Sequence, residues 1–407
     1  MIYDATTRIA EAALRLRASL GGRPALRERL VVGDLPEPAA IWVHGASVGE
    51  LTSARPVIEA LARQMSVQIT ANSETGRDMA RGWGLPARLA PLDVPGALDR
   101  FLGAVQPRVL VTIESEFWPL RSRLLAQRGI AHAMIGARMS ERSAGTWGRL
   151  PRIIRPILGR ITALSAQDQA SEARLLALGL PASALLPRLD LKLLGPADLT
   201  PPDPSEARDR VILAASTHEG EDEILLDAFA TLRRDRPDLR LILAPRHPQR
   251  AEAIAAMIAA RGLPMTRRSD SYTIAPEGGV LLADTLGEMG RWYEAAGICF
   301  VGGSLVDHGG HTPWEPAAMC CALLHGPHVG NFAESYDALH AHKAARAVEA
   351  GGLAAALARL LADPAEARRI GAAGRALLTA RAGDPGPLIR RIADLASAPA
   401  DHNMKGM

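Results

Sequence analysis

Short apolar segments alternate with amphipathic segments along most of this 407-residue chain. In the first half, apolar segments rich in β-formers lie between stretches of helical periodicity, at residues 40–44, 67–70, 109–113, 131–135 and 160–164. The second half repeats the rhythm at residues 210–215, 239–244, 279–283, 297–301 and 322–325. Strands that alternate with helices in this way usually form parallel sheets covered by helices. The pattern therefore predicts an α/β protein.

Residues 194–206 interrupt the alternation, because they are rich in proline and poor in apolar side chains. Breakers of this kind mark a linker between domains. We therefore expect an N-terminal Rossmann-like domain over residues 1–195, a linker over 196–208 and a C-terminal Rossmann-like domain over 209–407. Two such domains would leave a cleft between them, with the carboxyl ends of their strands facing it.

The first twenty residues form an amphipathic segment of their own. Ile2, Ile9, Ala13, Leu16 and Leu20 lie near one face of a predicted helix, with most of the arginines elsewhere. A helix of this kind either packs on its own domain or lies on an anionic bilayer, and the pattern leaves both open. No apolar run reaches the roughly eighteen residues of a membrane span, and no signal peptide core is present. We expect a chain that neither spans a membrane nor is exported.

The composition limits which kinds of binding site and cofactor are expected. The net charge is +3 and aromatic residues make up 4% of the chain, so no broad nucleic-acid surface is expected. Cys299, Cys320 and Cys321 lack any CxxC spacing and suit reduced core positions in a cytosolic protein. The histidines near strand ends lack zinc-ligand spacing. We expect no catalytic metal and no cofactor.

Residues 301–316, Val-Gly-Gly-Ser-Leu-Val-Asp-His-Gly-Gly-His-Thr-Pro-Trp-Glu-Pro, carry the strongest chemical signal. Glycine pairs follow a buried strand at its carboxyl end, where open α/β sheets bind ligands. Thr312 can cap a helix with Pro313 in its first position, and free amides there favour phosphate. Glu315, one turn in, is suited to ribose hydroxyls. Taken alone, the segment is also consistent with a simple turn in which Glu315 complements the helix dipole.

Charged residues follow strands in the first half as well. Glu50 opens a helix just after a strand, where it is equally suited to act as a general base or to compensate the helix dipole. Glu114 and Glu116 follow another strand, and their i, i+2 spacing places them on alternate sides of an extended segment. One of them is expected to serve chemistry and the other structure. Arg138 and Arg142 either hold a substrate anion or form a surface cluster.

In the second half, Arg246 follows a strand and can fork onto a phosphate, and residues 286–288 can present backbone groups to a base or ribose.

Taken together and in this order, these motifs resemble the Kdo transferases, which add 3-deoxy-D-manno-octulosonic acid (Kdo) from CMP-Kdo to lipid A precursors in Gram-negative bacteria. The resemblance runs from about Ala40 to Phe332 and rests on residues 44–50, 114–119, 137–143, 216–221, 245–248, 284–288, 309–316 and 326–328. It implies a GT-B-type α/β fold, with two Rossmann-like domains facing a central cleft. It also implies an inverting glycosyltransferase that moves Kdo to a glucosamine hydroxyl of lipid IVA in lipopolysaccharide biosynthesis.

The resemblance also implies roles for single residues. Glu50 matches the family's general base, Glu114 matches a carboxylate that assists the transition state, and Lys192 matches a transition-state cation. Around Lys192 only the Leu-Lys core of the family segment Gly-Asn-Leu-Lys-Phe-Asp is kept. The CMP contacts map onto Pro245, Arg246, Leu286, Gly287, Glu288, Thr312, Pro313, Trp314 and Glu315.

The chain departs from the family pattern at three places besides Lys192. Thr312 stands where an asparagine is usual, Trp314 stands where a leucine is usual, and the usual apolar N-terminal anchor is missing. The resemblance therefore implies a peripheral protein at the cytoplasmic face of the bacterial inner membrane. Its implied partners are CMP-Kdo, lipid IVA and the membrane surface, with no nucleic acid.

Two other classes of protein remain as alternatives. A sugar-nucleotide enzyme of the same fold, such as a non-hydrolysing epimerase, would turn over a UDP-sugar without a lipid acceptor. A non-enzymatic relative would bind only lipid or a protein partner, which the changes around Lys192 would favour. The presence of Glu50, Glu114 and Glu315 argues against the non-enzymatic relative.

Overall fold

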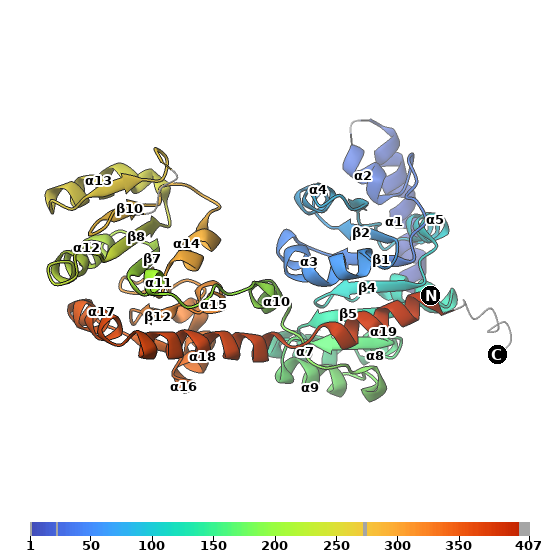
Figure 1. Ribbon diagram of the computed structural model, residues 1–407. Helices are drawn as coiled ribbons and strands as arrows, with labels where there is room; N and C mark the ends of the chain where they lie inside the picture. The colour runs from blue at the N-terminus through green and yellow to red at the C-terminus, as the bar shows by residue number, and fades with distance from the viewer. Residues whose placement is uncertain (1, 22, 272–274, 399–407) are drawn as a thin grey trace. The chain divides into compact units, whose positions relative to one another are not determined.

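The computed structural model describes residues 2–21, 23–271 and 275–398. Its contacts divide the chain into two compact units (Figure 1). The first takes the residues up to Gly195 together with those from Ala382 onward, and the second is Pro196–Arg381. Each unit contains one parallel sheet with helices packed on it, so the predicted α/β class is confirmed.

The first unit is built on a parallel sheet with the strand order β3-β2-β1-β4-β5-β6. Its strands are β1 (Ile41–Gly45), β2 (Val67–Ala71), β3 (Ala87–Leu89), β4 (Val109–Ile113), β5 (Ala131–Ala137) and β6 (Ala163–Ala166). Every residue of β1, β2 and β4 is buried. Burial along the whole strand is typical of a parallel sheet covered on both faces, and it explains the continuous apolar runs in the sequence.

The helices of the first unit begin with recognisable capping residues. Ser47 and Ser73 cap α3 and α4, and α5, α6 and α8 begin with a proline in the first turn, where its fixed φ suits a helix. The helices are α1 (Ile2–Ser19), α2 (Pro24–Arg29), α3 (Val48–Ala62), α4 (Glu74–Gly82), α5 (Pro95–Val105), α6 (Pro119–Gln127), α7 (Glu141–Gly148), α8 (Pro151–Leu158), α9 (Gln169–Ala177) and α19 (Gly386–Ser397), with α10 (Leu191–Asp198) at the unit boundary.

The C-terminal helix corrects the predicted domain boundary. Helix α19 packs against α3, β4, β5 and β6 of the first unit. Its buried residues Leu388, Ile392 and Ala396 recur every four positions, so they form one apolar stripe that needs an apolar partner. The second unit therefore ends at Arg381, and the expectation of a C-terminal domain over 209–407 is wrong in its last part. The predicted linker, 196–208, is counted in the second unit.

The second unit is built on a parallel sheet with the strand order β13-β12-β11-β7-β8-β10-β9. Its strands are β7 (Val211–Thr217), β8 (Arg240–Pro245), β9 (Met265–Arg267), β10 (Val280–Leu282), β11 (Ile298–Val301), β12 (Ala322–His325) and β13 (Ala345–Ala347). Its helices are α11 (Glu206–Asp209), α12 (Glu221–Leu232), α13 (Ala251–Ala260), α14 (Met289–Ala295), α15 (Trp314–Ala318), α16 (Ala333–Ala341), α17 (Leu353–Ala362) and α18 (Pro364–Ala382).

The core of the second unit joins the sheet to the helices on it, through residues such as Leu226, Phe229, Leu243, Phe300 and Leu357. Short 3-10 turns occur at Ala182–Ala184, Pro248–Arg250, Gly330–Phe332 and Ala350–Gly352. No helix in the described part of the chain combines the length and apolar character that crossing a bilayer requires.

Candidate active site

A buried chain of hydrogen bonds in the first unit leads to Glu116. Trp42 Nε1 donates to Thr70 Oγ1 over 2.8 Å, and the Thr70 hydroxyl lies 2.9 Å from His44 Nδ1. His44 Nε2 lies 2.5 Å from Glu116 Oε2. Burial, and after it the charge of Arg121, lowers the pKa of His44 although Glu116 acts to raise it. We therefore assign His44 as a neutral imidazole that donates through Nε2 and accepts from Thr70 at Nδ1.

Glu116 is the structural member of the acidic pair. Its carboxylate also accepts from Asn72 Nδ2 at 3.0 Å and from Trp118 Nε1 at 2.9 Å. Burial acts to raise the pKa of Glu116, but the hydrogen bonds from His44 and Trp118 outweigh it, and the net shift is downward. Glu116 is therefore an ionised carboxylate whose position is set by three donors, which leaves Glu114 as its neighbour without such a network.

Glu50 lies in the first turn of α3 and forms capping hydrogen bonds with the two residues that precede the helix. The Ser47 hydroxyl accepts from the Glu50 amide at 3.2 Å, and the Glu50 carboxylate accepts from the Ala46 amide at 2.7 Å. Burial raises the pKa of Glu50, and the charge of Glu114 adds to this, while the hydrogen bond from Ala46 opposes it. A helix cap and a carboxylate with raised proton affinity are thus combined in one side chain.

Glu114 has an unusual backbone. Its φ is 56°, in the left-handed region that few residues other than glycine adopt. Its amide donates to Ile135 O of the adjacent strand at 2.9 Å, so the turn is held in place by the sheet. Such a conformation costs about 1–3 kcal/mol and is found most often at functional sites.

Glu50 and Glu114 meet at a pocket of about 360 Å³. The lining includes Glu50, Glu114, Glu116, Arg138, Ser143 and Trp147, so carboxylates, a guanidinium and an aromatic ring share one cavity. Lys192 is exposed in the first turn of α10 and is not among the residues lining it. Arg142 is not among them either.

In the second unit, a buried carboxylate to which the sequence analysis gave no role fixes the loop after β11. Glu221, the first residue of α12, is 0% exposed. Its two oxygens accept backbone hydrogen bonds of 2.7 to 2.9 Å from the amides of His218, Gly303, Ser304 and Leu305. Glu221 therefore ties the loop after β7 to the loop after β11. The sequence had placed Glu221 at the end of the motif 216–221 but gave it no role.

Gly302, directly after β11, lets the backbone of the loop after β11 lie close to β7. A Cβ at Gly302 would lie 2.6 Å from the carbonyl oxygen of Ser216 in β7, so no side chain fits there. Gly303, the next residue, has a φ of 67°, which confirms the expectation that the glycine pair permits a tight turn at a strand end.

Four histidines gather at these loops. His218 Nε2 lies 2.9 Å from His311 Nε2, and the rings of His308 and His247 contact His218 at centroid distances of 4.2 and 5.7 Å. Burial, and then the neighbouring histidines, lower the pKa of His218 to about 4. The ring of His218 is therefore uncharged near neutral pH. Arg246 next to this cluster is exposed, and its amide donates to Thr217 O at 3.0 Å.

The other residues predicted to contact CMP, which follow β8 and β10, differ in their exposure and in the hydrogen bonds that they already make within the protein. Pro245 is buried at the end of β8. Leu286 is 74% exposed, and Gly287 has a φ of 85°. Glu288 accepts from the Thr285 hydroxyl and from Arg268 Nη2, and these bonds lower the pKa of its carboxyl. Its carboxylate is thus already engaged within the loop.

Helix α15 begins one residue later than the sequence predicted. Pro313 is its N-cap and Trp314 its first residue, while Thr312 Oγ1 accepts from the Trp314 amide at 3.4 Å. Trp314 is buried and donates from Nε1 to Ser335 Oγ at 3.2 Å. Desolvation by the surrounding residues raises the pKa of Glu315, although a hydrogen bond with Tyr293 opposes it.

Comparison with known proteins identifies the family. Residues 24–194 match the family model of 3-deoxy-D-manno-octulosonic-acid transferase (kdotransferase). The chain is 32% identical to the 3-deoxy-D-manno-octulosonic acid transferase of Haemophilus influenzae, over 91% of this chain and 89% of that protein. It is 36% identical to that of Bordetella pertussis, over 86% of this chain and 85% of that protein. The chain belongs to the Kdo transferase family. It is therefore a glycosyltransferase, as the sequence motifs implied.

The fold of this Kdo transferase is shared more widely. The structure of UDP-GlcNAc 2-epimerase from Neisseria meningitidis bound to UDP-GlcNAc aligns with a TM-score of 0.54 at 13% identity, over 87% of this chain and 98% of that one. At this identity the likeness concerns the fold alone. The predicted GT-B-type fold, with two Rossmann-like domains, is thereby confirmed.

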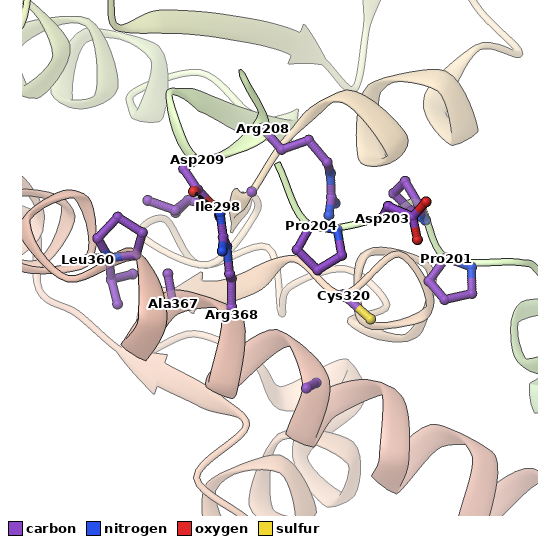
Figure 2. Close-up of a pocket in the computed structure, with 14 residues that line it drawn as sticks. Pro201, Asp203, Pro204, Arg208, Asp209, Ile298, Cys320, Leu360, Ala367 and Arg368 are labelled. Atoms are coloured by element: carbon purple, nitrogen blue, oxygen red, sulfur yellow. Dashed lines mark hydrogen bonds and ion pairs between the residues drawn. The ribbon is translucent and has the colours of Figure 1, made fainter. Parts of the chain in front are cut away.

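Another pocket of the Kdo transferase lies away from the predicted site residues (Figure 2). It has a volume of about 240 Å³ and is lined by Gly297 and Ile298, at the amino end of β11, and by the prolines of residues 201–204. Its charges are largely paired, since Arg368 and Asp209 form an ion pair of 2.5 Å. Among the described residues, no group of three or more histidine, cysteine, aspartate or glutamate side chains is arranged to hold a metal ion.

Proposed function

We propose that this Kdo transferase moves Kdo from CMP-Kdo to a glucosamine hydroxyl of lipid IVA, with inversion, in lipopolysaccharide biosynthesis. The observation that carries the proposal is the pocket in which Glu50 and Glu114 meet. Glu50 has a raised pKa there, which suits a group that must take up a proton during the reaction.

In the proposed reaction, Glu50 accepts the proton of the glucosamine hydroxyl while the hydroxyl oxygen attacks the anomeric carbon of Kdo. The bond from that carbon to the phosphate oxygen breaks, and CMP leaves with the electron pair. Glu114, held in the same pocket by its constrained backbone, stabilises the positive charge that develops on the sugar. Attack from the face opposite the leaving group gives inversion.

The second unit is proposed to bind the nucleotide. Arg246 would contact the phosphate, with Pro245 beside it. Leu286, Gly287 and Glu288 would contact the base or ribose. The start of α15, from Thr312 and Pro313 to Trp314 and Glu315, would complete the contacts. Support comes from the exposed position of Arg246 at a strand end and from Glu221, which holds the neighbouring loop. Lys192 is proposed as an additional cation for the leaving phosphate.

The decisive experiment is the substitution Glu50→Gln. The amide keeps the size of the side chain but cannot take up the proton, so transfer should fall by about 10²- to 10⁴-fold while CMP binding is retained. Transfer is followed as CMP release and lipid mass with CMP-Kdo and lipid IVA, without added metal. Glu59→Gln, in the surface ion pair with Arg55 on the same helix, is the matched control and should transfer normally. Normal transfer by Glu50→Gln would remove the base assignment.

We further propose that α1 holds the enzyme to the cytoplasmic face of the inner membrane. One face of α1 packs on the first unit, where buried Glu11 accepts from the Gly96 amide at 2.7 Å. The opposite face bears Ile9 and Leu16, 72% and 63% exposed, with Leu20 just beyond the helix end at 79%. Packing of α1 on its own domain and binding of α1 to a bilayer are therefore compatible, because each interaction uses a different face of the helix.

The positions of the arginines also support membrane binding by α1. Arg8, Arg15 and Arg17 flank the exposed apolar stripe, as expected for contact with anionic lipid. Changing Ile9, Leu16 and Leu20 together to serine should lower binding to phosphatidylglycerol-containing vesicles by at least about tenfold, because each large apolar side chain contributes roughly 1–3 kcal/mol when buried. Leu35→Ser, at an exposed leucine outside α1, is the control. Equal vesicle binding by the triple variant and the control would contradict the proposal.

A further inference from the structure

A second charged pocket lies beside β13, α16 and α18 of the second unit, and β13 is an edge strand of the sheet. Its volume is about 630 Å³, and its charged and polar lining consists of His340, His342, Lys343, Arg346, Glu366 and Arg369. None of the residues proposed to bind CMP lines it.

The lining carries an excess of positive charge. Glu366 is its only acidic residue and forms an ion pair with Arg346. Arg369 is 73% exposed, and its nearest acidic group in the described chain is Asp363 at 4.0 Å. Lys343 has no acidic group within 4.0 Å among the described residues. Two cations are therefore left with little or no compensation, which suits a ligand with about two negative charges.

The end of α16 positions the cation of Lys343. Lys343 follows the last turn of α16 with a φ of 55°, in the left-handed region. Its amide donates to His340 O at 3.0 Å, and the next amide donates to Leu339 O at 2.8 Å. This is the Schellman pattern of a helix end, in which glycine is the usual residue. The lysine at this position therefore lines the pocket from a helix end whose backbone is fixed by two hydrogen bonds.

His340, a lining residue at the same end of α16 as Lys343, is also held in place. His325 Nδ1 lies 2.7 Å from the Gly326 carbonyl oxygen, which only accepts, so Nδ1 carries a proton. Burial lowers the pKa of His325 to about 4, so the ring is neutral near pH 7 and its Nε2 must accept. The partner of that nitrogen is His340 Nε2, 2.7 Å away. The ring of His340 at the pocket is therefore fixed by a buried side chain.

We infer that this pocket binds a phosphate-bearing anion at a site separate from the sugar-nucleotide site. The cavity is larger than a single phosphate requires, so it has room for the group to which the phosphate is attached. That phosphate belongs either to a soluble phosphate ester or to a phospholipid headgroup. The inference does not depend on the proposed transfer reaction, since it shares no residue with it.

The test measures inorganic pyrophosphate binding to the full chain by calorimetry. Lys343→Gly removes the cation and relaxes the left-handed backbone, so it should weaken binding about three- to tenfold without lowering the melting temperature. Arg369→Gln should weaken binding by a similar factor. Arg234→Gln removes an exposed arginine of the same unit that is not part of the pocket, and should leave the affinity unchanged.

A second measurement separates the two sources of phosphate. The same proteins are floated with phosphatidylcholine vesicles that contain or lack phosphatidic acid. If Lys343→Gly and Arg369→Gln lower only pyrophosphate affinity, the ligand is a soluble phosphate; if they lower vesicle binding, it is a headgroup. The inference is overturned if neither variant changes either measurement, or if Arg234→Gln lowers both equally, because only general screening would then be at work.

Discussion

The buried carboxylate of Glu221 offers the most direct test of how the second unit is held together. It accepts hydrogen bonds from four backbone amides, two at each oxygen, and it has no exposed surface. Replacing it with glutamine keeps the shape and one carbonyl oxygen. The second oxygen becomes an NH₂ group, which donates and therefore faces two amides that also donate.

The size of the effect follows from those two amides. A buried amide left without an acceptor costs about 1–3 kcal/mol, so Glu221→Gln should lower the free energy of unfolding by about 2–6 kcal/mol. Domains of this kind are stable by only about 5–15 kcal/mol in total. The substitution should therefore remove a large fraction of the stability of the second unit.

The assay is urea unfolding followed by circular dichroism. Glu223→Gln, an exposed glutamate in the same turn of α12, is the control and should stay within about 0.5 kcal/mol of the unmodified protein. If Glu221→Gln unfolds within about 1 kcal/mol of that control, the four hydrogen bonds do not carry the stability assigned to them.

Three further predictions concern residues that lie in a strand or directly after one. Thr70→Val should lower unfolding free energy by about 1–3 kcal/mol in urea titrations, because the Trp42 indole loses its buried acceptor; no change would contradict the hydrogen-bond chain. Because the charge of Glu114 helps to raise the pKa of Glu50, Glu114→Gln should move the acid limb of the kcat/KM profile to lower pH, and an unmoved limb would exclude that coupling. Gly302→Ala should lower the melting temperature, because its Cβ would lie 2.6 Å from a carbonyl oxygen of β7.

Much of the fold was predictable because buried parallel strands are continuous apolar runs. The strands β3, β9 and β13 were not predicted. Each has three residues and is an edge strand of its sheet. Edge strands of this length carry few apolar residues, and β9 is only partly buried throughout. Periodicity therefore had too little signal to identify them.

The site was predictable where a residue's neighbours are close in sequence. The capping hydrogen bonds of Glu50 join residues three and four positions apart, so the motif itself contains the geometry. Glu221 contacts amides 82 to 84 positions away, and no local pattern reports such pairs. The assignment of helix α19 to the C-terminal domain was wrong for the same reason. Its apolar stripe shows that the helix needs an apolar partner but not which unit supplies it.

The return of the C-terminal helix to the first unit has a consequence for synthesis. The strands that α19 covers are translated well before it, because they end at Ala166 while α19 begins at Gly386. During the interval the apolar surface that receives Leu388, Ile392 and Ala396 lacks its native cover. The first unit therefore cannot finish folding on the ribosome until α19 has been made, and a fragment ending at the linker would leave an apolar surface exposed to aggregation or to chaperones.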